Sequence, residues 1–83
     1  MNPGERKIQT MVETLVRAFV DRPEDVVVSP AQRPDAGVLE LTVAPSDMGK
    51  VIGRQGRTAR ALRTLVSLAA EKLNRRFHLQ ILD

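Results

Sequence analysis

The segment VIGRQGRTAR, at residues 51–60, combines residue types that together can hold a phosphate group. Gly53 and Gly56 stand three positions apart and precede a pattern typical of a helix. Glycine adopts positive φ angles without strain, so the chain can reverse direction within a few residues. The amides of such a turn form an anion-binding concavity, to which the next helix adds free N–H groups and the positive end of its dipole. The segment therefore predicts contact with a phosphodiester backbone, although a tight turn between helices can also use two glycines for structural reasons alone.

Positive charge is concentrated in the part of the chain that carries this turn. Residues 1–49 hold five basic and eight acidic side chains, whereas residues 50–83 hold eight basic and two acidic ones. This asymmetry predicts an anionic partner for the second half, or else an arginine-rich helix face exposed to solvent. Arg54 and Arg57 place mobile positive charge at the turn itself.

Other kinds of chemistry find little support in the sequence. The chain has no cysteine and a single histidine, His78, so we expect neither a metal cluster nor a thiol nucleophile. Asp47 and Glu40 are isolated carboxylates, predicted to be a helix cap and a strand surface residue. The two aromatic residues, Phe19 and Phe77, are predicted to lie in the core rather than to form a stacking platform. The sequence contains neither the phosphate-binding loop motif of nucleoside triphosphatases nor the glycine motif of dinucleotide-binding sites. We therefore expect that the protein is not an enzyme and that it binds no cofactor and no metal.

Length and composition indicate one small domain covering residues 1–83. No apolar run approaches the roughly 20 residues of a membrane span, and the first ten residues lack the apolar core of a signal peptide. The absence of cysteine is consistent with a reducing compartment. We therefore expect a soluble, cytoplasmic protein.

Hydrophobic periodicity predicts the first three elements. Residues 5–23 carry apolar side chains at spacings of three and four, which predicts a helix that Asn2 caps and a proline ends. The β-branched run at residues 25–31 predicts a strand. Residues 38–44 alternate between apolar and polar types and predict a half-buried strand, joined to the first by the turn-forming residues 32–37.

Three further elements follow around the glycine turn. A short helix is predicted over residues 45–52, with Ser46 or Asp47 as its cap. A long helix runs from about residue 57 to residue 74, with an arginine-rich side opposite its apolar arc. Residues 77–83 alternate and predict a last strand.

The predicted order is α-β-β-α-α-β, which indicates an α+β fold: a three-stranded mixed sheet with three helices packed on one face. The apolar arc of the long helix includes Leu65. The predicted core comprises Ile8, Leu15, Phe19, Leu41, Val43, Leu62, Val66, Ala69, Phe77 and Leu79.

The stretch VAPSDMGKVIGRQGRTARALRTLVSLAAEKL, at residues 43–73, resembles the signature of the K-homology (KH) domain. The element order resembles the type II, bacterial arrangement, and the length resembles the small single-KH bacterial proteins of the KhpA type. One departure is Thr58-Ala59, where many KH motifs carry isoleucine soon after the second glycine. This departure thins the apolar wall expected there.

The resemblance implies that the turn clamps the backbone of about four unpaired nucleotides. Val51 and Ile52 are expected at or near the floor of a groove, one of them as a core residue, and the sequence leaves open which faces the groove. Arg63, Arg75 and Arg76 lie farther along the chain and are expected to be ordinary surface residues. The implied RNA-binding residues are Lys50, Val51, Ile52, Gly53, Arg54, Gln55, Gly56, Arg57 and Arg60, of which Lys50, Arg57 and Arg60 would contact phosphates.

The resemblance also implies protein partners. Ala61 and Leu68 lie at the edge of the apolar arc and are candidates for a dimer interface. Proteins of this type are associated with homodimers, with a larger KH-containing partner of the Jag type and with control of cell elongation. The leading hypothesis is therefore an RNA-binding protein acting in post-transcriptional regulation or as an RNA chaperone. The alternative is a dimerisation subunit with little RNA binding of its own.

Overall fold

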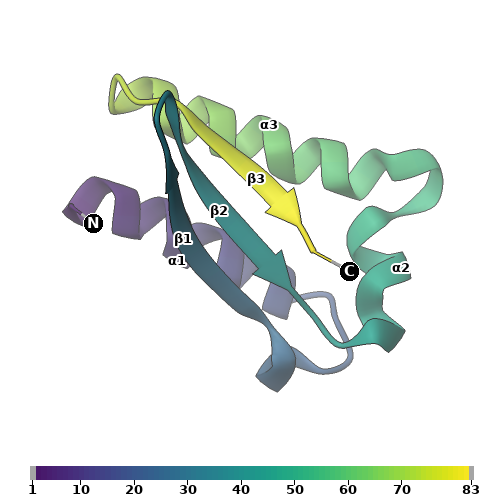
Figure 1. The fold of residues 1–83 in the computed structure, drawn as a ribbon. Coiled ribbons are helices and arrows are strands. Elements are labelled where there is room, and N and C mark those ends of the chain that lie inside the picture. Colours follow the sequence, from purple (N-terminus) through teal and green to yellow (C-terminus); the bar gives the residue numbers. More distant parts are fainter. Residues whose placement is uncertain (1, 83) are drawn as a thin grey trace.

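The computed structural model describes residues 2–82 and confirms the α-β-β-α-α-β order. Single turns of 3-10 helix lie at Pro23–Asp25, Pro45–Asp47 and Arg54–Gly56. Asp83, which was included in the predicted last strand, lies outside the described residues. The helices are α1 (Pro3–Arg17), α2 (Met48–Ile52) and α3 (Arg57–Lys72), and the strands are β1 (Val27–Arg33), β2 (Ala36–Thr42) and β3 (Phe77–Ile81) (Figure 1).

The three strands form one mixed sheet in the order β1-β2-β3. β1 and β2 are antiparallel, with Val28 opposite Leu41, and β3 joins the other side of β2 in parallel, with Leu79 opposite Leu39. A parallel neighbour needs a crossover connection, which α2, the glycine turn and α3 supply. β3 is therefore an edge strand, and α3 packs beside it (Figure 1).

The core lies between the helices and one face of the sheet, as predicted. Of the predicted core residues, six are buried, and Leu15, Val43 and Ala69 are partly buried and pack against them. The buried cluster comprises Ile8, Val12, Val16, Val26, Val28, Leu39, Leu41, Val51, Leu62, Val66, Ala70, Phe77 and Leu79.

Phe19 does not belong to the core, contrary to the prediction. The helical stripe was extended to Pro23, but α1 ends at Arg17 and Ala18 caps it. Beyond the cap the chain tightens, and the Phe19 N–H donates to the carbonyl of Val16 across 3.2 Å. Phe19 is consequently 37% exposed, and its neighbour Val20 packs against the core.

The N-terminus of α1 is fixed by a reciprocal capping box. The Asn2 side chain accepts from the Glu5 N–H across 2.8 Å, and the Glu5 carboxylate accepts from the Asn2 N–H across 3.3 Å. Glu5 is also buried, and its second oxygen lies 2.6 Å from the Arg75 guanidinium, off hydrogen-bonding geometry but in close ionic contact. This ion pair joins the first turn of α1 to the connection between α3 and β3.

Candidate functional site

The glycine turn forms between α2 and α3, as the sequence predicts. Gly53 ends α2 with φ 77° and ψ 169°, a combination that is essentially restricted to glycine. Gln55 and Gly56 follow in the left-handed region, with φ angles of 56° and 73°. The Gly56 N–H donates to the Gly53 carbonyl across 3.1 Å, which closes the turn. The backbone thus reverses sharply here and carries strain at Gln55, a residue type that rarely adopts positive φ.

The side chains of the turn are exposed to solvent. Arg54 and Gln55 are both exposed, and the Gln55 amide oxygen accepts from the Arg57 guanidinium across 3.3 Å. Arg60 is exposed one helical turn after Arg57. The turn therefore presents three arginines, none of which forms an ion pair within residues 2–82.

α2 is anchored by a buried carboxylate. Asp47 is fully buried and accepts from the backbone N–H groups of Asp21 and Arg22 across 3.0 and 2.9 Å. It makes no capping bond to its own helix, so its predicted role as a cap of the short helix is wrong. The hydrogen bond from Asp21 holds the pKa of the Asp47 carboxyl below its usual range; burial opposes this effect, and the bond from Arg22 and the nearby Lys50 charge add to it.

Lys50 forms a second link between α2 and the connection from α1 to β1, which contains Asp21. Its ammonium lies 2.8 Å from the Asp21 carboxylate and 3.8 Å from that of Asp47. The hydrogen bond to Asp21, followed by the charge of that carboxylate, raises the pKa of Lys50. Lys50 therefore helps to hold the helix that precedes the turn and has an acidic partner within the protein.

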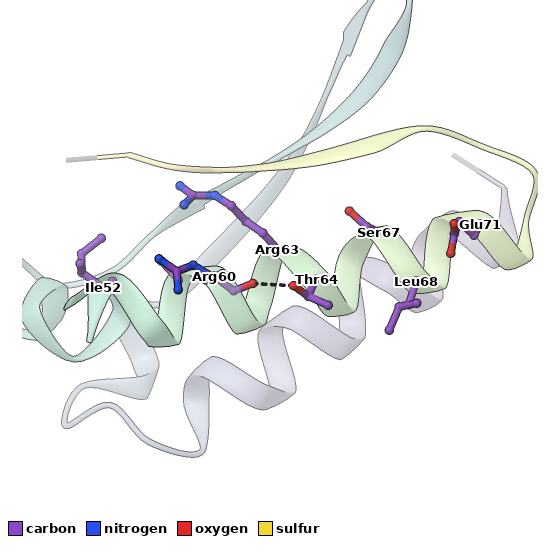
Figure 2. Close-up of a pocket in the computed structure, with 9 residues that line it drawn as sticks. Ile52, Arg60, Arg63, Thr64, Ser67, Leu68 and Glu71 are labelled. Carbon is purple, nitrogen blue, oxygen red and sulfur yellow. Dashed lines mark hydrogen bonds between the residues drawn. The ribbon is translucent and has the colours of Figure 1, made fainter. Parts of the chain in front are cut away.

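A groove of about 650 Å³ begins at the turn and follows α3 (Figure 2). Val51 is fully buried in the core, whereas its neighbour Ile52 is 38% exposed and lines the groove. One of the two was expected in the core, and that residue is Val51, whereas Ile52 faces the groove. The lining comprises Ile52, Gly56, Ala59, Arg60, Arg63, Thr64, Ser67, Leu68 and Glu71.

Arg63 lines the groove, although its sequence position predicts an ordinary surface residue. Its Nε donates to the carbonyl oxygen of Leu79 across 3.4 Å, which links α3 to the edge strand β3. Figure 2 shows Arg63 and Ser67 pointing toward β3 and Leu68 pointing away from it. A signal was available, because Arg60, Arg63 and Ser67 recur at helical spacing on the polar side of α3.

Apolar side chains are also exposed along α3, next to the groove, and Leu68 belongs to both. Leu68 is 57% exposed and Ala61 is also exposed, as expected for candidates at an interface. Leu65, which was predicted in the buried arc, is 40% exposed. Ala61, Leu65 and Leu68 follow one another at spacings of four and three, so they lie along one side of the helix.

No group of three or more His, Cys, Asp and Glu side chains within residues 2–82 is arranged to hold a metal ion. No helix in this range has the length and apolar character required to cross a membrane.

Comparison with known proteins gives consistent matches. Residues 9–81 match the family model described as KhpA/KhpB, KH domain. An RNA-binding protein KhpA from Halalkalibacterium halodurans is 51% identical over 76 residues, which cover 92% of this chain and all of that protein. A protein of the same name from Clostridium perfringens is 45% identical over 75 residues, covering 90% of this chain and all of that protein.

A solved structure has the same fold. The crystal structure of Aquifex aeolicus Era bound to GDP.AlF4- superposes with a TM-score of 0.66 and 17% identity. The match covers 98% of this chain and 31% of the Era chain. The α-β-β-α-α-β order and the mixed sheet are those of a type II KH fold.

Proposed function

Because the chain belongs to the KhpA/KhpB family of KH domains, we propose that it binds single-stranded RNA across the Gly53–Gly56 turn. The family is not enzymatic, as the sequence predicts for this chain. The observation that carries the proposal is the juxtaposition of the strained turn, its three arginines without ion pairs within residues 2–82, and the groove that begins at Gly56. We propose further that residues 1–83 form one KH domain.

The phosphates lie over the turn and the N-terminus of α3. There the free N–H groups, Arg54, Arg57 and Arg60 attract them. The bases of about four nucleotides point into the groove, over the apolar surface that Ile52 and Ala59 provide. Arg63 lines the groove on the side of α3 that faces β3, where its Nε donates to the Leu79 carbonyl. This arrangement explains how RNA is gripped without an aromatic platform.

The protein acts in the cytoplasm, in post-transcriptional regulation or as an RNA chaperone, together with a second KH domain. The partner is a second copy or a larger KH-containing protein of the Jag type. The exposed Leu65 and Leu68 on α3 support such an interface, since apolar side chains of this size favour burial against a partner. A dimerisation subunit that influences cell elongation with little RNA binding is the alternative, and the RNA experiment below separates the two.

The test reverses the charge of the turn. We expect Arg54→Asp/Gln55→Asp to weaken binding of a short single-stranded RNA about tenfold or more, because two carboxylates then face the phosphates. Both side chains are exposed, and aspartate tolerates the positive φ at position 55, so the melting temperature should change little. Fluorescence anisotropy with an RNA of about four nucleotides measures the affinity.

A matched control exists in the same chain. Gln32 and Arg33 are also adjacent and exposed, and they lie at the turn between β1 and β2. Gln32→Asp/Arg33→Asp makes the same change in charge and should leave the affinity for the short RNA within about twofold, because exposed charges beyond about one Debye length are screened. Equal RNA affinity in the wild type and the Arg54→Asp/Gln55→Asp variant would refute the proposed site.

A further inference from the structure

The groove along α3 leads into further hollows that lie away from the glycine turn. A second hollow of about 390 Å³ shares Ser67 and Glu71 with the groove and is lined further by Arg75, Arg76 and the start of β3. A third hollow, of about 200 Å³, shares both of these arginines and extends to the turn between β1 and β2, where Arg33 lies. The three hollows form one path along α3 and across the end of the sheet.

The second hollow lies at the far end of the molecule from the glycine turn. Ser67 is eleven residues after Gly56, which places it about 16 Å along the helix axis. In Figure 1 the connection between α3 and β3 lies beside the β1–β2 turn, at the end of α3 opposite to α2. A ligand that reaches this end must therefore extend past the nucleotides at the turn.

The charged groups at this end differ in their availability. Arg75 is held by the buried Glu5, and Arg33 donates to the Gln80 side chain across 3.2 Å. Arg76 is exposed and forms no ion pair within residues 2–82. The acidic residues in these linings are Glu71 and Asp35, so the cations outnumber them. Arg76 is thus the arginine of this end that has neither an ion pair nor a side-chain hydrogen bond within residues 2–82.

We propose that the RNA strand bound at the turn continues along this path and that Arg76 binds the phosphate of a nucleotide beyond the first four. The proposal rests on the RNA-binding function proposed above and extends it to a longer strand. The ligand at this end is a further nucleotide of the same single strand. The arrangement gives a longer RNA one additional phosphate contact.

Strand length and salt dependence together test this inference. Each phosphate that a cation neutralises on a single strand adds roughly −0.7 to the slope of log K against log salt. We expect the slope for an RNA of about eight nucleotides to be steeper by roughly 0.7 than that for about four. Arg76→Gln should abolish this increment and weaken the longer RNA about fivefold, the upper range for an exposed charge pair, while leaving the shorter RNA unchanged.

The matched control is Lys72→Gln, which removes one positive charge near the same end of α3. Lys72 lines a hollow between α1 and α3, with Lys7 and Leu73, rather than the proposed path. We expect the Lys72→Gln variant to retain the steeper salt dependence of the longer RNA relative to the shorter one. Equal slopes for the two RNAs, or equal effects of the two variants on the longer RNA, would overturn the inference and leave the turn as the binding site. Failure of the wild type to bind either RNA would overturn the proposed function together with it.

Discussion

The side chain of Thr58 occupies the space in which a side chain on Gly53 would have to lie. A Cβ added to Gly53 would come within 2.7 Å of the Thr58 Cβ and would collide with its hydroxyl. Thr58 belongs to the first turn of α3, so the contact packs the end of α2 directly against the start of α3. The glycine at position 53 is thus required twice, by its backbone angles and by this close approach.

Alanine substitutions at three glycines should therefore differ in a defined order. We expect Gly53→Ala to lower the free energy of unfolding by about 3 kcal/mol or more, since strain and overpacking add. Gly56→Ala meets open space and should cost about 1 kcal/mol for its left-handed backbone alone. Urea denaturation measures both.

Gly49→Ala is the control for this series. Gly49 lies within α2 and has open space around a Cβ, so alanine should raise the free energy of unfolding by up to about 1 kcal/mol through helix propensity. Equal losses for Gly53→Ala and Gly56→Ala would show that the contact with Thr58 does not constrain the turn.

The buried carboxylate of Asp47 should make stability depend on pH. Its pKa is lowered in the folded protein, first by the hydrogen bond from Asp21, so the ionised form contributes stability above the ordinary pKa of aspartate, about 3.9. This contribution is lost as the pH falls through the lower, folded pKa. At neutral pH we expect Asp47→Asn to lower the melting temperature by about 5 °C or more.

The difference between the wild type and Asp47→Asn should shrink as the pH falls below about 4, because the wild-type carboxyl then takes up a proton. Thermal unfolding followed by circular dichroism over this range measures it. Asp25→Asn, which disrupts an exposed ion pair with Arg22, should change the melting temperature little. A constant difference between the two proteins at all pH values would contradict the role given to Asp47.

The pairing of Lys50 with Asp21 leads to a prediction about RNA affinity. We expect Asp21→Asn to strengthen binding of a short single-stranded RNA about threefold, because it frees Lys50 beside the turn. Adding Lys50→Gln should cancel this gain. Asp25→Asn controls for the change in net charge, and fluorescence anisotropy provides the measurement. If Lys50→Gln in the wild type weakens binding more than Arg57→Gln does, Lys50 contacts phosphate in spite of its acidic partner.

The exposed side of α3 can be tested separately from the groove. We expect the wild type to self-associate and Leu65→Glu to weaken that association without unfolding the domain, because the side chain is already exposed. Leu68 lines the groove as well, so Leu68→Glu should weaken association and can also affect RNA. Phe19→Glu changes an exposed apolar residue at the end of α1 and serves as the control. Sedimentation of the wild type as a monomer at high concentration would contradict the interface.

The local features of the chain could be predicted from its sequence. The glycine turn, the end of α2 at Gly53 and the cap at Asn2 each depend on residue types within a few positions. The core faces of the strands and of α3 also followed from periodicity, because burial repeats with the geometry of each element.

The features that were missed depend on contacts between distant segments. Asp47 is spaced like a helix cap, yet its partners are backbone groups of Asp21 and Arg22 in another connection. Arg63 lines the groove because its partner, Leu79, lies on a strand that the chain reaches later. Phe19 was misplaced because the periodicity continues past the point where α1 ends.

The ion pair between Glu5 and Arg75 has a consequence for the order of assembly. It joins residues that are seventy positions apart in the sequence, so it closes most of the chain into a loop. Closing a loop of this length lowers the conformational entropy of the chain before the contact is gained, so such contacts form late in folding. The glycine turn needs only its immediate neighbours in the sequence. We therefore expect the two ends of the groove to form at different times during folding. The glycine turn forms first, and the arginine-rich end forms once α1 has packed against the rest of the domain.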